Sequence, residues 1–469
     1  MPVFTLDELI KATAGKLVRR GNDQQIKGVS IDSRTLVPGE VFIALKGLNF
    51  DGHDYVQTAI EKGAVAVITE RELPLPPAWR GTVINVPDTR EAFGHLARFH
   101  RLRFDGPVIG ITGSNGKTTT KELIASILAQ TGKVVKTEKN FNNEIGLPLT
   151  LLKITSDTSA VVVEMGMRGK GQIAYLAKLA QPTMGVITNI GVTHLELLGS
   201  QGAIAEAKGE LIQALPPSGV AVLNGDDPFV TRMGTGFSGK TLYYRLHFRK
   251  DESGPAPDLF TVAITTKGDR EEVTVDGRWG QFDFSLPLLG RHNVANALAA
   301  ALVGLNLGHK PEEVALGLAN VHNLEKRLRR LEIAGITVLD DTYNASPASV
   351  QAGLEVLQKI DHPGRKIAVL GDMLELGPIG KAAHRQTGEM VARYGCAALF
   401  TYGPLSLEMK KGAAKKGVLA YHFSTKEELW LKLKAYLAPG DAILIKGSRG
   451  MEMEGIVEKI IALEKGGEK

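Results

Sequence analysis

The alternation of apolar and polar positions divides the chain into three regions. In the first, up to about residue 105, short apolar runs such as Val41–Leu45 and Ala64–Ile68 alternate with turns around one early helix. The segment Gly47–Tyr55 between these runs is rich in glycine and aspartate, which are typical of turns. The pattern predicts a small α/β module at the start of the chain.

From Pro107 the pattern changes to buried strands followed by helices. Val108–Thr112 is an apolar run that ends in a glycine-rich turn, and Thr118–Ala129 has helical spacing with its apolar positions on one face. Further apolar runs typical of strands lie at residues 134–135, 160–163 and 185–188. This alternation predicts a parallel sheet with both faces covered by helices.

Between Leu242 and Leu289 the pattern favours hairpins. The alternating runs Glu272–Val275 and Phe282–Phe284 flank Asp276–Gly277, a dipeptide typical of hairpin turns. The central region is therefore expected to carry a β-hairpin extension.

From about Leu328 strands and helices alternate again. The expected strands lie at residues 336–339, 367–370, 398–400 and 442–445. This pattern predicts a Rossmann-like, doubly wound sheet whose ligands bind at the carboxyl ends of the strands. The fold class predicted for the whole chain is α/β, in three domains over residues 1–105, 106–327 and 328–469.

Composition agrees with a folded chain of this size. The 469 residues suggest about three domains, and 43% hydrophobic with 23% charged residues excludes a mainly disordered protein. The single cysteine, Cys396, excludes an intrachain disulfide and a cysteine-based metal site, and it suits a reducing cytosol.

Charge and hydropathy exclude two classes of partner. The net charge of +5 comes from scattered basic residues rather than a dense stripe interleaved with aromatic residues, so no nucleic-acid partner is expected. The first residues carry acids where a signal peptide needs bases, and no run approaches the roughly 18 apolar residues of a membrane span. We expect a cytoplasmic protein with no membrane partner, and a monomer.

A glycine-rich turn lies between the first strand and the first helix of the central region. It keeps Gly113, Gly116, Lys117 and Thr118, whereas the standard phosphate loop would need a glycine at position 111 in place of isoleucine. Such glycines let backbone N–H groups face an anion at a helix N-terminus. Lys117 would reach the phosphates of a nucleotide and Thr118 a Mg²⁺ ion. The residues alone leave open a chance glycine-rich turn that happens to carry a lysine.

Two side chains follow the next strands of the same sheet. Glu164 ends the run 160–163, and a carboxylate level with a phosphate loop suits Mg²⁺. His194 follows the run 185–188, but neutral imidazole is an unusual ligand for Mg²⁺, so a more anionic group should accompany it. A loop-capping acid and a structural histidine remain open alternatives. Lys208 lies in a helical stretch beside two acidic residues, and this context predicts a solvated lysine without a role.

Together these motifs resemble the Mur ligase family over nearly the whole chain. Besides the shortened glycine loop, the segments that carry the resemblance are residues 140–148, 290–297, 340–347, 370–377 and 446–452. The last three resemble the branch that joins D-alanyl-D-alanine to a UDP-N-acetylmuramoyl-tripeptide. One departure is Ser346, where the branch usually has asparagine, and we expect little consequence because a small polar residue remains.

The resemblance implies an ATP-dependent ligase of peptidoglycan synthesis that forms an amide through an acyl phosphate and uses two Mg²⁺ ions. It implies that ATP binds to Gly113, Ser114, Asn115, Gly116, Lys117, Thr118, Thr119, Asn293, Asn296 and Arg327. Arg327 resembles the family's hinge-proximal arginine, which approaches the phosphates on closure.

The catalytic residues implied by the resemblance are Lys117, Glu164, His194 and Lys208. Lys208 aligns with a lysine that CO₂ converts to a carbamate, which would supply the anion missing beside His194. Thr118 and Glu164 would hold the first Mg²⁺. His194, with Glu164 or the modified Lys208, would hold the second.

The resemblance also assigns the substrates to the outer domains. UDP-N-acetylmuramoyl-tripeptide would contact Ser33, Arg34, Gly47, Asp51, His53, Asn140, Asn142 and Asn143. The D-Ala-D-Ala side of the site would include Asp341, Tyr343, Asn344, Lys446, Ser448 and Arg449. Two alternatives stay open: a ligase similar to folylpolyglutamate synthetase, and a P-loop NTPase that acts as a switch.

Overall fold

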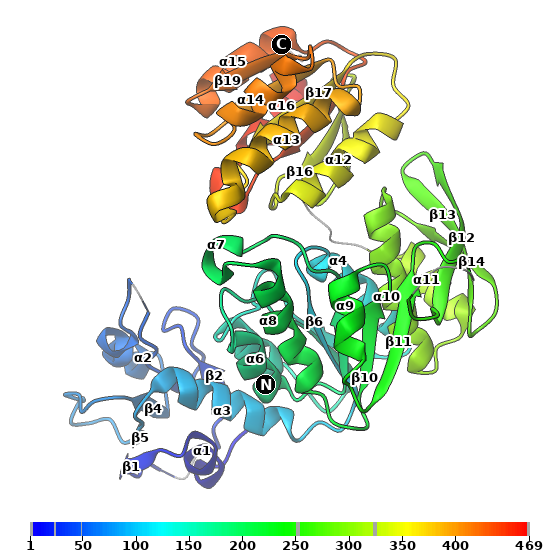
Figure 1. Ribbon diagram of the computed structural model, residues 1–469. Coiled ribbons are helices and arrows are strands. Elements are labelled where there is room, and N and C mark those ends of the chain that lie inside the picture. Colours follow the sequence, from blue (N-terminus) through cyan, green and yellow to red (C-terminus); the bar gives the residue numbers. More distant parts are fainter. Residues whose placement is uncertain (1–2, 23–24, 48, 250–253, 322–325, 467–469) are drawn as a thin grey trace.

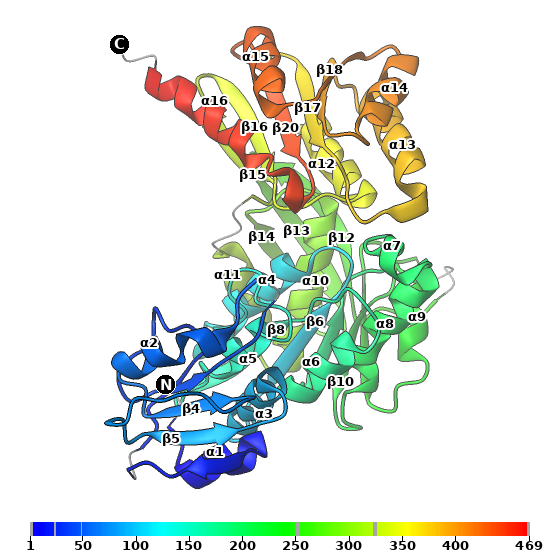
Figure 2. The ribbon, with the colours of Figure 1, turned by 90° about the vertical axis from the view of Figure 1, so that its left-hand side faces the viewer.

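The computed structural model of the chain describes residues 3–22, 25–47, 49–249, 254–321 and 326–466 (Figure 1). Its elements form three units, each built on one β-sheet. We call them the N-terminal unit (Leu6–Arg101), the central unit (Val108–Ala319) and the C-terminal unit (Arg329–Gly466). Figure 2 shows the first and last of these at opposite ends of the molecule. Within the described ranges, none of the helices combines the length and the apolar character needed to cross a membrane.

The N-terminal unit has a five-stranded sheet in the order β1-β5-β4-β3-β2, in which β1 pairs antiparallel and the other pairs are parallel. Helix α3 begins at Asp88, whose carboxylate accepts hydrogen bonds from the N–H groups of Arg90 and Glu91. Its residues Phe93 and Leu96 belong to a core shared with the central unit, so these two units are packed together. The elements are α1 (Leu6–Thr13), β1 (Lys16–Arg19), β2 (Val29–Ser30), β3 (Val41–Ile43), η1 (Gly52–Tyr55), α2 (Val56–Glu61), β4 (Ala66–Thr69), β5 (Thr82–Asn85) and α3 (Thr89–Arg101).

The central unit has a nine-stranded sheet in the order β14-β13-β12-β11-β10-β9-β6-β8-β7. Strands β6 to β12 pair in parallel, and β12, β13 and β14 form an antiparallel extension. The elements are β6 (Val108–Thr112), α4 (Lys117–Leu128), β7 (Lys133–Lys136), α5 (Gly146–Leu151), β8 (Thr158–Glu164), α6 (Gln172–Ala180), β9 (Met184–Ile187), α7 (Leu195–Leu198), α8 (Gln201–Gln213), β10 (Val220–Asn224), α9 (Pro228–Gly234), β11 (Lys240–Arg245), β12 (Leu259–Lys267), β13 (Arg270–Gly277), β14 (Phe282–Leu286), α10 (Arg291–Asn306) and α11 (Pro311–Ala319).

Both faces of the central sheet are covered. Because successive strand residues point to opposite faces, Val161 and Val163 of β8 join the core beneath α6 and α8, whereas Val162 joins the core beneath α4 and α10. Strands buried on both sides explain the continuous apolar runs of the sequence.

The C-terminal unit has a six-stranded sheet in the order β15-β16-β20-β17-β18-β19, parallel except for the β15–β16 hairpin. Helices α12 to α14 cover one face and α15 and α16 the other. The elements are β15 (Arg329–Ile333), β16 (Ile336–Asp341), α12 (Pro347–Lys359), β17 (Lys366–Gly371), η2 (Gly377–Ile379), α13 (Gly380–Arg393), β18 (Ala398–Tyr402), α14 (Leu407–Lys415), β19 (Leu419–Phe423), α15 (Lys426–Tyr436), β20 (Ala442–Lys446), η3 (Arg449–Met451) and α16 (Glu454–Gly466).

The predicted α/β fold class is confirmed, and two local expectations were wrong. The first region holds α2 and α3 as well as the one early helix, in stretches for which the sequence analysis predicted no helix. The predicted hairpin between the runs 272–275 and 282–284 is confirmed, since β13 pairs antiparallel with β14, but its turn lies at residues 278–281 because Asp276 and Gly277 still pair with β12.

Candidate active site

The central site is built where three parallel strands end. Ile111 of β6 pairs with Glu164 of β8, and Thr112 of β6 pairs with Ile187 of β9. The glycine loop, the carboxylate of Glu164 and the segment after β9 therefore meet at one edge of the sheet. This is the edge at which open α/β sheets bind ligands.

Two glycines of the loop are required by close contacts. Gly113 and Gly116 have φ of 151° and 81°, in the region that favours glycine. A Cβ atom would lie 1.9 Å from Oγ1 of Thr188 at Gly113, and 2.4 Å from Oδ1 of Asn296 at Gly116. The loop is thus pressed against the end of β9 on one side and against α10 on the other.

The segment that follows β9 fixes the loop by hydrogen bonds. The N–H of Ser114 donates to the carbonyl of Asn189 (2.9 Å), and the N–H of Asn115 donates to Oδ1 of Asn189 (3.0 Å). The hydroxyl of Thr188 donates to the carbonyl of Asn115 (2.6 Å), and the N–H of Gly191 donates to Oγ of Ser114 (2.8 Å). The loop conformation is therefore held by the protein itself.

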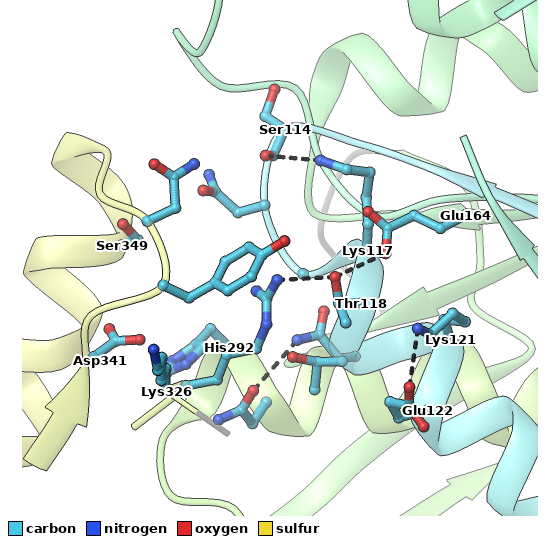
Figure 3. Close-up of a pocket in the computed structure, with 18 of the residues that line it drawn as sticks. Ser114, Lys117, Thr118, Lys121, Glu122, Glu164, His292, Lys326, Asp341 and Ser349 are labelled. Carbon is cyan, nitrogen blue, oxygen red and sulfur yellow. Dashed lines mark hydrogen bonds and ion pairs between the residues drawn. The ribbon is translucent and has the colours of Figure 1, made fainter. Parts of the chain in front are cut away.

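The hydroxyl of Thr118 lies at the centre of a polar chain (Figure 3). It donates to Oε2 of Glu164 (2.7 Å) and accepts from Nη2 of Arg327 (2.8 Å). Nζ of Lys117 donates to the carbonyl of Gly113 (2.8 Å). Burial lowers the pKa of Lys117, while the nearby Glu164 carboxylate opposes that shift. Lys117, Thr118, Glu164 and Arg327 thus meet in one place.

Lys208 is buried, contrary to the expectation from its helix alone. Its side chain is 1% exposed on α8 and lines a cavity together with Lys117 and His194. Within the described residues its amine has neither a hydrogen bond nor an ion pair. Burial, with the nearby charge of Lys117, holds the pKa of Lys208 well below its ordinary value. The solvated-lysine interpretation was wrong, because packing of α8 decides which face is buried.

His194 lies where the central and C-terminal units meet. Its Nδ1 atom is 2.5 Å from Oε2 of Glu375, a close contact that is not aligned as a hydrogen bond. Burial lowers the pKa of His194, and Glu375 opposes that shift. No three His, Cys, Asp or Glu side chains cluster as metal ligands in the described part of the chain. Glu164 and His194 would therefore need a further anion to hold a second cation.

A cavity of about 1110 Å³ lies between the central and C-terminal units, and we call it the two-unit cavity. Its lining includes the loop residues Ser114 to Thr119 and, from the first turn of α10, Asn293 and Asn296. Nδ2 of Asn293 donates to the carbonyl of Leu289 (2.9 Å), which fixes that turn. Figure 3 shows Lys117, Thr118 and Glu164 on the opposite side of this cavity from Asp341 and Ser349.

A second cavity of about 1040 Å³ is lined by all three units, and we call it the three-unit cavity. Asn140, Asn142 and Asn143 line it, between the glycine loop and the start of α3. Nδ2 of Asn142 donates to Oε1 of Glu164 (2.8 Å). This segment therefore joins the N-terminal side of the cleft to the carboxylate of the central site.

The five predicted residues of the N-terminal unit do not line either cavity. The Arg34 side chain is 86% exposed and pairs with Asp32, and Ser33 is buried. Gly47 and Asp51 lie in one loop. Both ring nitrogens of His53 have partners, since Nδ1 lies 2.5 Å from Oδ1 of Asp51 and Nε2 accepts from the N–H of Glu70 (2.9 Å). The ring of His53 thus stabilises this loop.

The predicted residues of the C-terminal unit divide into buried and open groups. Nζ of Lys446 pairs with Oδ2 of Asp341 (2.5 Å) and donates to the carbonyl of Asn344 (2.8 Å). Burial raises the pKa of Asp341 and lowers that of Lys446, each opposed by the partner's charge. The two side chains therefore offset each other's charge. Asn344 is exposed and lines both cavities.

Three other side chains of this unit have different partners. The guanidinium of Arg327 stacks 4.1 Å from the ring centroid of Tyr343. The hydroxyl of the buried Ser448 accepts from the N–H of Leu374 (2.8 Å). The side chain of Arg449 is 61% exposed. One of its guanidinium nitrogens pairs with Oε1 of Glu454 (2.6 Å), and the side chain lines the three-unit cavity.

Ser346, the departure from the branch, joins the two units. Its hydroxyl donates to Oδ1 of Asn115 (3.0 Å) and accepts from the N–H of Ser349, where it caps α12. The small polar side chain thus keeps a hydrogen bond across the two-unit cavity.

The sequence analysis missed three residues that position the site: Thr188, Asn189 and Glu375. Thr188 ends a predicted strand and Asn189 directly follows it, and that position was the available signal. Glu375 lies in the segment 370–377, which carried the resemblance but gave no sign that its loop would reach His194.

Three family models match successive parts of the chain. They are the Mur ligase family, catalytic domain (residues 25–101), the Mur ligase middle domain (residues 111–304) and the Mur ligase, glutamate ligase domain (residues 326–449).

Relatives match over nearly the whole length. The UDP-N-acetylmuramoyl-tripeptide–D-alanyl-D-alanine ligase of Bacillus subtilis is 38% identical, covering 97% of this chain and 98% of that protein. A crystal structure of MurF from Acinetobacter baumannii superposes with a TM-score of 0.88 at 31% identity, covering 98% and 99% of the two chains. The MurF ligase of Thermotoga maritima in complex with ADP gives 0.83 at 30% identity, covering 95% and 99%. A folylpolyglutamate synthase of Mycobacterium tuberculosis shares the fold alone, at 17% identity, 0.62 and coverages of 79% and 93%.

The buried pair Asp341–Lys446 is expected to contribute to stability. Removing one partner of such a pair costs about 3–5 kcal/mol, because it leaves the other charge buried alone. Asp341→Ala should therefore lower the thermal unfolding midpoint clearly, and Asp341→Leu with Lys446→Met should recover most of the loss. The exposed pair Glu427–Lys459 is the control, and Glu427→Ala should change stability by less than about 1 kcal/mol. An unchanged midpoint in Asp341→Ala would show that the pair has no structural role.

Proposed function

The chain belongs to the Mur ligase family, and we propose on that basis that it is the ATP-dependent ligase that adds D-alanyl-D-alanine to UDP-N-acetylmuramoyl-tripeptide in peptidoglycan synthesis. The observation that carries the proposal is the polar chain at the glycine loop. Thr118, Glu164 and Lys117 lie together at a helix N-terminus, at the edge where two cavities from three units meet.

The reaction needs an activated carboxyl group, since a carboxylate is a poor electrophile. Transfer of the γ-phosphoryl group of ATP to the tripeptide carboxylate gives an acyl phosphate and ADP. The dipeptide amine then attacks the carbonyl carbon, phosphate leaves, and the nitrogen loses a proton. Proteins catalyse such transfers mainly by positioning and by offsetting charge, and we propose that Lys117 and Arg327, which meet at the glycine loop and Thr118, do this for the phosphates.

The residues present fit a first Mg²⁺ ion. Thr118 and Glu164 offer hydroxyl and carboxylate oxygens, the donors that Mg²⁺ prefers, and their 2.7 Å contact shows that they face one point. We propose that they hold the first of two ions. When bound, Mg²⁺ would neutralise phosphate charge during transfer of the phosphoryl group.

We propose that Lys208 is carbamylated and helps His194 to hold the second ion. Carbamylation requires the neutral amine, and the buried Lys208, whose pKa is lowered, favours that form. The modification would turn an unpaired buried nitrogen into an oxygen donor. It would also give the cleft the further anion that Glu164 and His194 need.

Each unit has a separate task in this proposal. Residues 1–105 bind the UDP-sugar peptide, residues 106–327 bind ATP and residues 328–469 bind the dipeptide. Closure of the C-terminal unit over the two cavities would exclude water from the acyl phosphate. We propose that the reaction takes place in the cytoplasm, because it consumes ATP. We also propose that the protein acts as a monomer.

The direct experiment is a product assay with purified protein, ATP and Mg²⁺. UDP-muramoyl-tripeptides ending in lysine and in diaminopimelate are tested side by side, each with and without D-Ala-D-Ala. We expect ADP, phosphate and a pentapeptide product to appear together and only when both peptide substrates are present. Phosphate release that does not depend on the peptide substrates would contradict the ligase proposal and favour a P-loop NTPase that acts as a switch.

Lys117→Ala is expected to lower kcat by at least about 100-fold, since the phosphates lose a positioned cation. Lys240→Ala is the matched control, because Lys240 is an exposed lysine bonded to Asn306 outside both cavities. A kcat near that of the wild type in Lys117→Ala would contradict the role of the glycine loop.

Lys208→Ala is expected to cause a large loss of activity that acetate or formate partly restores, because a small carboxylate can take the place of the carbamate. ¹³C NMR of the wild type in labelled bicarbonate should show one carbamate signal that Lys208→Ala lacks. Full activity in Lys208→Ala without any added carboxylate would refute the modification.

A further inference from the structure

The C-terminal unit contributes charged side chains of both signs to the three-unit cavity. Of its residues that line this cavity, Glu375 is the acid and Arg449 the base. Asp341 and Lys446, two further charges at these strand ends, are buried against each other, and the buried carboxylate of Asp372 accepts from the N–H groups of Leu405 and Ser406. Recognition of a charged substrate by this unit therefore falls to Glu375 and Arg449.

The two side chains come from adjoining loops. Strands β17 and β20 are neighbours, with Leu370 paired to Lys446, and the loops that follow them are joined by the hydrogen bond from the N–H of Leu374 to Oγ of Ser448 (2.8 Å). Glu375 and Arg449 each lie one residue beyond that bond. A dipeptide in extended conformation spans about 7 Å. Side chains on two adjoining loops can contact both ends of a molecule of that length.

Glu375 is held against the central site. Its carbonyl accepts from the N–H of Glu196 (3.3 Å), and Oε2 lies 2.5 Å from Nδ1 of His194. Both Glu375 and His194 have a left-handed backbone, with φ of 61° and 64°, which the surrounding contacts must maintain. The Glu375 side chain is nevertheless 40% exposed, so a ligand in the cavity can reach it.

The charges that line this cavity indicate which group of a ligand the Glu375 carboxylate binds. A cationic amine that approaches the reacting carboxyl group meets the amine of Lys117, which lines the same cavity. Glu375 is an anion on the C-terminal unit, which would deliver the amine, and it lies beside His194 of the central unit. Arg449 keeps an open guanidinium, with one nitrogen bonded to Glu454 (2.6 Å).

We propose that Glu375 binds the α-ammonium group of the incoming dipeptide and that Arg449 binds its terminal carboxylate. The inference rests on the proposed function and names the residues that select a zwitterionic dipeptide. Glu375 thus places the amine next to the carboxyl group that is activated at the central site.

The test compares two ligands that differ only at the ammonium group. Binding of D-Ala-D-Ala and of D-lactyl-D-alanine, in which a hydroxyl replaces the ammonium, is measured by calorimetry with a non-hydrolysable ATP analogue and the UDP-tripeptide present. The wild type should prefer the dipeptide by about 10- to 100-fold, as expected for a charged hydrogen bond. Glu375→Gln should reduce that preference to about 2-fold or less.

Two variants separate recognition from a structural effect. Glu375→Asp keeps the charge and should keep most of the preference, and Glu196→Gln removes a neighbouring charge and should keep it all. In rate assays Glu375→Gln should raise KM for D-Ala-D-Ala by about 10-fold or more while KM for ATP stays within about 2-fold. Arg449→Gln should likewise abolish discrimination between the dipeptide and its C-terminal amide.

A full preference for the ammonium ligand in a folded Glu375→Gln protein would overturn the inference, as would an equal loss in Glu196→Gln. Failure of the proposed function would look different. In that case the wild type itself would form no pentapeptide with either tripeptide.

Discussion

The parallel register of β6, β8 and β9 is the constraint on which the rest of the structure depends. It brings the ends of three strands level, so that the glycine loop, Glu164 and the Thr188–Asn189 pair meet at one edge. Each then fixes another: Asn189 holds the loop, and Thr118 on the loop's helix bonds to Glu164. A shift of one residue in β8 would turn Glu164 to the opposite face of the sheet and separate it from the glycine loop.

Charge explains why the site needs the central and C-terminal units together. The central unit places the amine of Lys117 at a helix N-terminus beside the buried carboxylate of Glu164, an arrangement that suits a polyphosphate. Burial lowers the pKa of both Lys117 and Lys208, and the neutral amine that this favours at Lys208 is the form that carbamylation requires. The segment before the C-terminal unit adds Arg327, and the C-terminal unit itself adds Glu375 from its β17 loop. Closure therefore alters the electrostatics of the site as well as its exposure to water.

The sequence predicted the features that depend on short-range pattern. Buried strands of four to seven residues followed by helices gave the α/β class, and the glycine loop was found from Gly113, Gly116 and Lys117 because its chemistry is local. Lys208 could not be judged in this way, since only tertiary packing shows which face of α8 is buried. Glu375 was missed for a related reason: its contact with His194 joins residues 181 positions apart and depends on how two units dock. Asp341 and Lys446 were found as strand-end charges, but their mutual pairing follows from the β16–β20 register.

The central claim is that the γ-phosphoryl group of ATP is transferred to the substrate carboxylate at the glycine loop. The most direct measurement uses a UDP-muramoyl-tripeptide whose terminal carboxylate carries ¹⁸O at both oxygens, with mass spectrometry of the phosphate released during a complete reaction. Transfer through an acyl phosphate predicts that one labelled oxygen passes from the carboxylate to each phosphate formed. Phosphate without label, formed together with the amide product, would contradict the account.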